Sequence, residues 1–359
     1  AARNPAGVAV AARPAHYPTI VAEIRQFGAV TAETRAALAA EAFGIVAAYH
    51  AEVAAYLHQL SGNRFPPRLA LVLEKVADLR YGENPHQQAA FYRETTHRSG
   101  TIADAVQLAG GRPSFNNLLD LDAAWRIVSD FTGPTVAIVK RTDPVGLASA
   151  EALVDAYKRA LDTDPVTAFG GTIGCNREVD EVTAEEIAAN TFEAIVAPGY
   201  SERALEILRG RPGLEVLAVP ANPTEGLRDY GIASLDFKRI GGGLLVETMD
   251  SLALDRGQLP VVTRRHPTLD ELNDLLFAWR AVRHVRSNAV VLAKHGATVG
   301  IGGAQPSRTT AVEIALRKAG DRARLAVMAS DAYFPFPDGI AHAALAGRLV
   351  EDVDPHVVG

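Results

Sequence analysis

The sequence predicts an α/β protein, and two kinds of segment carry this prediction. Short continuous apolar runs rich in β-branched residues, such as residues 136–139, are typical of buried strands covered on both faces. Longer segments with apolar residues at three-and-four spacing, such as residues 31–57 and 269–285, are typical of amphipathic helices. A chain of 359 residues, 48% of them hydrophobic, is long enough for two or three units with cores of their own.

Composition and charge exclude several classes of function. The net charge of −6 argues against a general nucleic-acid surface, so an anionic ligand would need a local cluster of cations. Cys175 is the only cysteine, which excludes a disulfide framework and a thiolate metal cluster. No apolar run is expected to approach a membrane span, and the first residues lack the apolar region of a signal peptide. We therefore expect a cytoplasmic protein without a nucleic-acid, membrane or metal partner.

The first segment of the chain predicts one strand and a helical pair. Residues 7–11 predict a short strand and residues 14–18 a turn. Helices are expected over residues 19–27 and 31–57, with Thr31 as the N-cap of the second. One strand and two helices make a poor core by themselves, so we expect this segment to be an appendage of a larger body.

The clearest linker is the stretch SGNRFPP at residues 61–67. Its Gly, Pro and polar residues are typical of an irregular connection, and the composition changes on either side of it. We therefore predict a domain boundary there, with the appendage at residues 1–60.

Residues 135–150 predict a strand that delivers two cations into a turn. Lys140 and Arg141 directly follow the apolar run, residues 143–146 supply turn residues, and helical spacing is expected over 148–161. Ligands favour such strand ends in open α/β sheets. The alternative is that Lys140 and Arg141 only mark a strand that leaves the core for water.

Several motifs of this chain resemble the AICAR transformylase/IMP cyclohydrolase family, and they occur in that family's order. They are LRYGENPHQ (79–87), FNNLLDLDAAW (115–125), DPVTAFGG (164–171), EAIVAPGY (193–200), GGLLV (242–246), HVRSNAVVLAK (284–294) and SDAYFPFPDG (330–339). The resemblance covers roughly residue 64 to the end. The residues before it resemble the last part of the family's cyclohydrolase domain.

The resemblance implies a specific fold and assembly. It implies two cytidine-deaminase-like subdomains of the AICAR transformylase type, at residues 68–240 and 241–359. The short remnant of a methylglyoxal-synthase-like cyclohydrolase domain would precede them. Similar proteins build their sites from both subunits, so a homodimer with sites at the subunit interface is implied.

The resemblance also implies a reaction. Similar proteins move a formyl group from 10-formyltetrahydrofolate to the 5-amino group of an aminoimidazole carboxamide ribotide. Lys140 matches the family's catalytic lysine, and Asn288 matches the asparagine that orients the formyl group. A ring-bound amine is a poor nucleophile, so its attack needs help with a proton and stabilisation of the oxyanion.

Binding of the ribotide and the folate would use a further set of residues. The implied substrate-binding residues are Arg80, Tyr81, Asn117, Glu193, Gln305, Arg308, Tyr333 and Asp338. Arg80 and Arg308 would hold the phosphate, since a phosphate needs fixed cations and directional donors. Asn117 and Tyr81 would hydrogen-bond ribose or carboxamide groups.

The chain departs from the family at the residue after the lysine, where similar proteins have histidine and this chain has Arg141. Histidine shuttles a proton near neutral pH, whereas arginine stays charged. Arg141 could bind an anion, stabilise an oxyanion, or lower the pKa of Lys140 so that this amine becomes a base. Asp143 is a second candidate base, or it pairs with Arg141 and does no chemistry.

Other departures lie in the glycine loop and at the two ends. Ala304 and Pro306 change a loop in which the family has a second glycine and a variable position. The lysine and histidine of the family's AAKNH motif are replaced in residues 1–5, and the chain ends at residue 359, before the family's last strand and helix. We therefore expect no cyclohydrolase activity.

The sequence leaves three functions open. The first is a specialised folate-dependent formyltransferase that acts on the aminoimidazole ribotide or a close analogue. The second is an inactive relative that only binds a ribotide. The third is a transferase that uses another acyl or one-carbon donor, with Lys140 as base or nucleophile.

Overall fold

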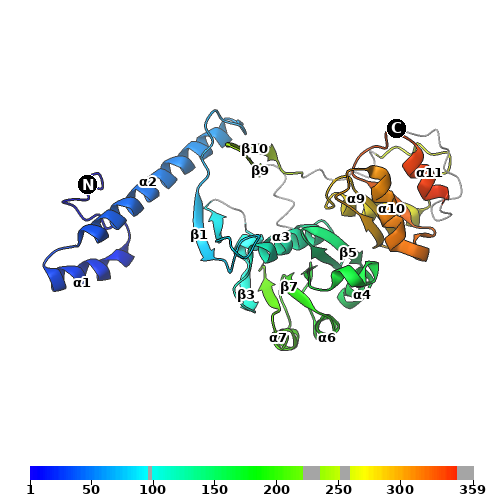
Figure 1. Cartoon of the computed structure of the whole chain (residues 1–359), viewed down its shortest axis with the longest axis horizontal. Helices are drawn as coiled ribbons and strands as arrows, with labels where there is room; N and C mark the ends of the chain where they lie inside the picture. Colours follow the sequence, from blue (N-terminus) through cyan, green and yellow to red (C-terminus); the bar gives the residue numbers. More distant parts are fainter. Residues whose placement is uncertain (96–98, 221–234, 251–258, 346–359) are drawn as a thin grey trace. The chain divides into compact units, whose positions relative to one another are not determined.

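The computed structural model describes residues 1–95, 99–220, 235–250 and 259–345 (Figure 1). Contacts divide them into two units. The first is Ala1–Ala77 with a short segment that begins at Phe91, and the second is the rest of the described chain. The predicted linker, residues 61–67, lies inside the first unit, between its long helix and its first strand.

Helices dominate the first unit. The elements from the N-terminus to the unit boundary are η1 (Pro14–His16), α1 (Tyr17–Phe27), α2 (Ala32–Leu60), β1 (Leu73–Asp78) and β2 (Ala90–Glu94), of which β1 and β2 form a two-stranded sheet. The predicted strand at residues 7–11 is wrong, since these residues form a turn and coil with no ladder partner. The predicted turn at 14–18 is also wrong. Pro14 and Pro18 begin helices instead, at positions where the missing N–H is not needed.

Helix α2 has the predicted N-cap, and it also contains a long apolar run that was not predicted. Thr31 Oγ1 accepts a hydrogen bond from the backbone N–H of Thr34 at 3.2 Å, which confirms the cap. Within α2, Ala32–His58 is long and apolar enough to cross a membrane, with a mean hydropathy of 1.2, so the expectation that no run approaches this length is wrong. Many alanine methyl groups produce that value. A single helix of this length and composition is weak evidence for a membrane span, so we assign no membrane contact to α2.

The second unit is built on a nine-stranded mixed sheet, which confirms the α/β class. In spatial order its strands are β13 (Val327–Ser330), β11 (Val290–Lys294), β12 (Ala297–Gly302), β5 (Asp143–Ser149), β4 (Thr135–Lys140), β6 (Gly171–Cys175), β7 (Phe192–Ala197), β8 (Glu215–Ala218) and β3 (Val106–Ala109). Strands β6, β7 and β8 are parallel, and the other pairs are antiparallel. Strands β9 (Leu235–Ile240) and β10 (Gly243–Thr248) form a separate hairpin.

Helices cover both faces of this sheet. They are η2 (Ile102–Asp104), α3 (Phe115–Ser129), α4 (Leu153–Thr163), α5 (Pro165–Ala168), α6 (Glu181–Ala188), α7 (Glu202–Arg209), α9 (Leu269–Val282), α10 (Arg308–Ala319), η5 (Gly320–Ala323) and α11 (Asp338–Leu345). One core cluster contains residues of α3 and α9, and another those of α4, α6 and α7. Figure 1 shows α6 and α7 on the opposite side of the strands from α3.

Strand β4 lies between these two cores. Ala137 and Val139 belong to the core on the α3 side, and Val136 and Ile138 to the core on the other side. All four are fully buried. The prediction of a strand covered on both faces is confirmed.

The predicted order of strand, turn and helix after residue 135 needs a correction. Residues 143–146 belong to strand β5, which pairs with β4, and helix α4 begins only at Leu153. The turn is the two-residue connection Arg141–Thr142, whose φ angles of 53° and 67° match a hairpin of the mirror-image type. Gly146 is a glycine inside β5. Any side chain there would put its Cβ 1.9 Å from the carbonyl oxygen of Ala160 in α4.

Candidate active site

The strand directions bring the candidate residues to one edge of the nine-stranded sheet. Strand β4 ends at Lys140 and β5 begins at Asp143, and we call the edge where they meet the site edge. By the pairing of their neighbours, β6, β7, β8 and β11 also begin there, and β3, β12 and β13 end there. Glu193 in β7 and Asn288 before β11 therefore lie on the same edge as Lys140.

The hairpin at the end of β4 is held by Asp120 of α3. Its carboxylate accepts hydrogen bonds from the backbone N–H of Arg141 at 3.1 Å and of Thr142 at 2.6 Å. Burial raises the pKa of Asp120, and these two hydrogen bonds oppose that rise. The sequence analysis missed Asp120, although it lies in the FNNLLDLDAAW motif. Asp120 fixes the two left-handed residues and thereby the position of Lys140 next to them.

Lys140 is partly buried and keeps its ammonium on backbone acceptors. Its Nζ donates to the carbonyl of Phe169 at 2.7 Å and, more weakly, to that of Thr167 at 3.4 Å. Within the described parts of the chain, no carboxylate forms an ion pair with Lys140. The amine is therefore oriented by neutral groups, and its charge is available to an incoming ligand.

Asp143 pairs with Arg286, not with Arg141. Its carboxylate accepts from Arg286 Nε at 2.7 Å and from the backbone N–H of Arg286 at 3.0 Å. Arg286 lies on the loop before β11, and its Nη2 is 2.6 Å from Asp143 Oδ2. This ion pair joins the Lys140 hairpin to the loop that carries Asn288.

Asn288 is held at both ends of its side-chain amide. Arg308 Nη2 donates to Asn288 Oδ1 at 2.8 Å, and Asn288 Nδ2 donates to the carbonyl of Gln305 at 2.9 Å. Arg308 also donates to Ser330 and Asp331 at the end of β13, and its side chain is only 12% exposed. Arg308 thus orders Asn288.

Asp331 supports this arrangement from the end of β13. Burial by itself would raise its pKa, but hydrogen bonds from Ser287, the backbone N–H of Ala289 and Arg308 hold it below its usual range. The carboxylate is therefore charged, and it anchors both Arg308 and the first residues of β11. Asp331 lies in the SDAYFPFPDG motif, but it was not among the residues expected at the site from the sequence.

A second group of candidate residues surrounds the first turn of α3. Asn117 is the N3 residue of a capping box with Ser114, and its Nδ2 donates to Glu193 Oε2 at 3.3 Å. Phe115 donates its backbone N–H to the carbonyl of Tyr81, which places the 79–83 loop at this helix end. The Arg80 guanidinium lies over the Tyr81 ring, 4.9 Å from its centroid.

The remaining candidate residues lie past β12 and β13. Gln305 donates its side-chain amide to the carbonyl of Gly303 at 2.9 Å. Asp338 begins α11 and accepts a hydrogen bond from Thr309 at 3.1 Å. Tyr333 is 74% exposed and is not brought into the Asn288 group by the fold.

Glu215, the first residue of β8, is a buried acid that the sequence analysis missed. It is 4% exposed, and its Oε2 has no hydrogen-bond partner among the described residues. Burial raises its pKa to about 7; Arg80 opposes this rise, and Glu193 adds to it. The one signal in the sequence was a glutamate inside the apolar run 214–219.

This buried acid predicts how stability depends on pH. The unfolded chain loses the Glu215 proton near its ordinary pKa of 4.5, and the folded chain only near 7. Between these values the folded state binds more protons, so its stability falls as the pH rises through this window. The free energy of unfolding of Glu215→Gln, measured in urea, should rise relative to that of wild type by roughly 2 kcal/mol as the pH goes from about 5 to about 8. A constant difference at all pH values would contradict the prediction.

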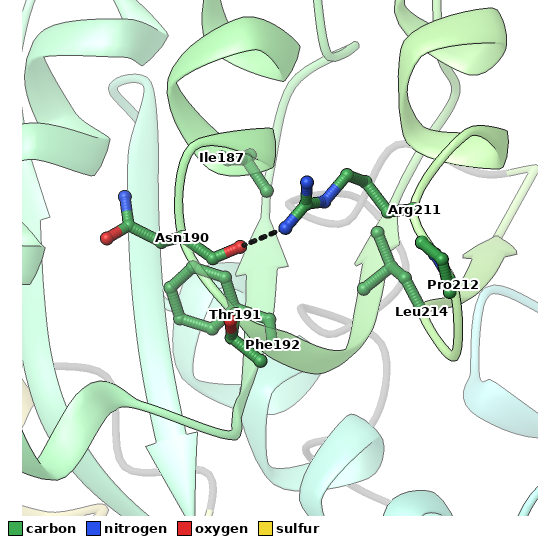
Figure 2. Close-up of a pocket in the computed structure, with 7 residues that line it drawn as sticks. All are labelled: Ile187, Asn190, Thr191, Phe192, Arg211, Pro212 and Leu214. Atoms are coloured by element: carbon green, nitrogen blue, oxygen red, sulfur yellow. Dashed lines mark hydrogen bonds between the residues drawn. The ribbon is translucent and has the colours of Figure 1, made fainter.

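Two cavities of the described chain lie away from the candidate residues, none of which lines either of these two. The cavity in Figure 2 holds about 30 Å³, room for one water molecule, and the Arg211 guanidinium points across it toward the carbonyl of Asn190 at 3.4 Å. A larger cavity of about 540 Å³ is lined by Gly133, Ser149 and Gly296 among others, at the sheet edge opposite the site edge.

Comparisons with known proteins agree with the motifs at this edge. A sequence model of the AICARFT/IMPCHase bienzyme family matches residues 1–318. The bifunctional purine biosynthesis protein PurH of Thermoanaerobacter sp. (strain X514) is 44% identical over 356 residues, which are 99% of this chain and 68% of that protein. The proteins of the same name from Sorangium cellulosum and Anoxybacillus flavithermus are 46% and 42% identical.

These two relatives each cover 97% of this chain, and the chain covers 68% and 67% of their lengths. The match therefore extends over both structural units and over every residue of the site edge up to Arg308. This chain belongs to the AICARFT/IMPCHase bienzyme family.

Proposed function

We propose that this chain transfers a formyl group from 10-formyltetrahydrofolate to the amine of an aminoimidazole carboxamide ribotide or a close analogue. The observation that carries the proposal is that the Asp143–Arg286 ion pair joins the hairpin of Lys140 to the loop of Asn288. Asp143, which pairs with Lys140 in the hairpin, binds Arg286, two residues before Asn288. The membership of the family supports the same reaction.

The proposed chemistry forms one bond and breaks one. The acceptor nitrogen attacks the formyl carbon, the carbonyl oxygen becomes an oxyanion, and the bond from that carbon to N10 of the folate then breaks. The acceptor amine loses a proton, and N10 of tetrahydrofolate gains one. Lys140, with no carboxylate partner in the described chain, would stabilise the oxyanion, and Asn288 would orient the formyl group.

The proton needs a carrier, and Arg141 cannot be one at neutral pH. The Asp143 carboxylate is engaged by Arg286, so proton transfer to it would break an ion pair with a 2.7 Å contact. We therefore propose that the substrate itself takes the proton. This substitute would be slower than a histidine, and it supports a specialised acceptor.

We place the ribotide phosphate at Arg80. Its guanidinium is exposed, and among the described residues it makes one side-chain hydrogen bond, to the Tyr81 hydroxyl at 3.3 Å. Asn117 and Glu193 lie at the same helix end and would hydrogen-bond the ribose or the base. Arg308 is committed to Asn288 and Asp331, so its contact with a phosphate would be secondary.

The proposal includes the finer expectations on architecture. We propose two deaminase-like subdomains at residues 68–240 and 241–359, a homodimer whose sites lie at the subunit interface, and a cytoplasmic location. Folate would be the co-substrate, without a catalytic metal.

The Arg141→His variant tests the proposed function. Residue 141 has a φ of 53°, a left-handed conformation in which histidine is enriched over most other residues, so the turn should accept it. We expect the wild type to release tetrahydrofolate at a measurable rate. Arg141→His should release it about 10²-fold faster, because a general base returns beside Lys140. The assay is spectrophotometric, with 10-formyltetrahydrofolate and the aminoimidazole carboxamide ribotide.

A second candidate is a relative that binds the ribotide without turnover. It is favoured because, in the described chain, neither residue expected as a base beside Lys140 is free for that role. Position 141 holds an arginine, and Asp143 is paired with Arg286. Binding of the ribotide without tetrahydrofolate release, in both wild type and Arg141→His, would support it. Turnover with a non-folate acyl donor alone would instead replace the folate in the proposal.

A further inference from the structure

Glu215 lies where β8 begins on the site edge, under the first turn of α3. Side chains alternate along a strand, so Glu215 shares the α3 face with Leu217, which packs in the core with α3. On its other side β3 brings Gly110, where an added Cβ would be 2.7 Å from Glu215 Cα. A glycine at position 110 therefore lets the backbone after β3 pack against the backbone of Glu215.

Two charged groups act on this buried carboxyl. Arg80, from the loop after β1, donates its backbone N–H to the carbonyl of Pro113 at 3.1 Å, three residues after the Gly110 that packs on Glu215. Glu193 precedes Ala194, which pairs with Glu215 between β7 and β8. From these positions Arg80 favours the charged form of the Glu215 carboxyl, and Glu193 disfavours it. The first turn of α3 has no titratable side chain before Asp120. Burial is the main cause of the raised pKa of Glu215, and with Oε2 unpartnered among the described residues these two charged neighbours adjust it.

An anion bound to Arg80 would change this balance in one direction. Its negative charge would lie near Glu215, and it would also neutralise the guanidinium that now favours the carboxylate. Both effects favour the protonated carboxyl. A phosphate at Arg80 and a charged Glu215 therefore oppose each other.

We propose that Glu215 is a positioning residue that takes up a proton when the phosphate of the ligand binds at Arg80. The inference rests on the proposed function, which puts the ribotide phosphate there. Phosphate affinity then depends on pH, because the protonated carboxyl permits the anion to approach and the carboxylate repels it. In the window above about pH 7, where free Glu215 is charged, wild type binds more weakly than at lower pH.

The variant Glu215→Gln should behave as a permanently protonated Glu215. At about pH 8 it should bind the ribotide roughly three- to tenfold more tightly than wild type, and at about pH 6 equally well. The gain at high pH distinguishes the proposal from a structural role, since loss of a structural residue weakens binding.

The experiment is isothermal titration calorimetry of the full chain with the aminoimidazole carboxamide ribotide, in two buffers of different ionisation enthalpy at each pH. Wild type should take up a fraction of a proton more than Glu215→Gln on binding at about pH 7.5. Glu202→Gln, which removes the same charge from the exposed start of α7, should match wild type. A cooperative urea unfolding transition of Glu215→Gln near pH 6 would establish that the variant is folded.

The outcomes separate this inference from the proposed function. Ribotide binding with equal proton uptake in wild type and Glu215→Gln overturns the inference and leaves formyl transfer standing. Ribotide binding that is weakened by Glu215→Gln at every pH overturns it as well. No ribotide binding by wild type overturns the placement of the phosphate at Arg80 and the inference with it, whereas the Arg141→His assay reports on formyl transfer independently.

Discussion

Replacement of Lys140 by methionine should lower the rate of formyl transfer by roughly 10²- to 10⁴-fold while the protein stays folded. The ammonium is the one cation at the end of β4 that is oriented inward by two carbonyl groups, those of Phe169 and Thr167. Methionine keeps most of the apolar stem and removes the charge and the donors. The rate is measured as tetrahydrofolate release, and folding by the unfolding midpoint in urea.

Lys294 provides a matched control for this variant. It is also the last residue of a strand, β11, and its Nζ donates to a backbone carbonyl, that of Arg324, at 3.0 Å. Because β11 runs away from the site edge, Lys294 lies at the opposite edge. Lys294→Met should keep the wild-type rate. If both variants lost activity equally, or Lys140→Met retained it, Lys140 would have no role in the reaction.

The variant Gly146→Ala should destabilise the protein by about 3 kcal/mol or more. Strand β5 and helix α4 approach so closely at this point that a Cβ would be 1.9 Å from the carbonyl oxygen of Ala160 and 3.2 Å from Thr163 Cβ. A backbone oxygen inside a helix cannot move aside as a flexible side chain can, so β5 and α4 must separate. Urea unfolding of both proteins at one pH measures the difference.

Gly133→Ala is the control for this effect. A Cβ on Gly133 would meet nothing within 4 Å, and the residue does not have a positive φ. Its free energy of unfolding should stay within about 0.5 kcal/mol of the wild-type value. A Gly146→Ala protein as stable as this control would mean that β5 and α4 do not pack as described.

The local pattern of the sequence was enough to predict several elements. Four apolar, β-branched-rich residues predicted the buried strand β4, and Thr31 predicted a helix start, because strand burial and helix capping depend on neighbours in sequence. Local pattern failed at residues 7–11, where β-branched residues found no partner strand. It also placed the turn after Lys140 two residues too late, since Pro144 and Gly146 resemble turn residues wherever they occur.

The sequence by itself determined the family, the α/β class and the identity of Lys140 and Asn288 as candidates, because ordered motifs and hydrophobic periods are written locally. Only the tertiary structure decided which groups meet. Asp143 pairs with Arg286, 143 residues away, and not with the adjacent Arg141. The strand order also buries Glu215, packs its backbone against Gly110 and brings Arg80 and Glu193, from a separate loop and strand, to act on its carboxyl. Contacts between residues so far apart in the sequence depend on the order and direction of the strands, which a local sequence pattern does not specify.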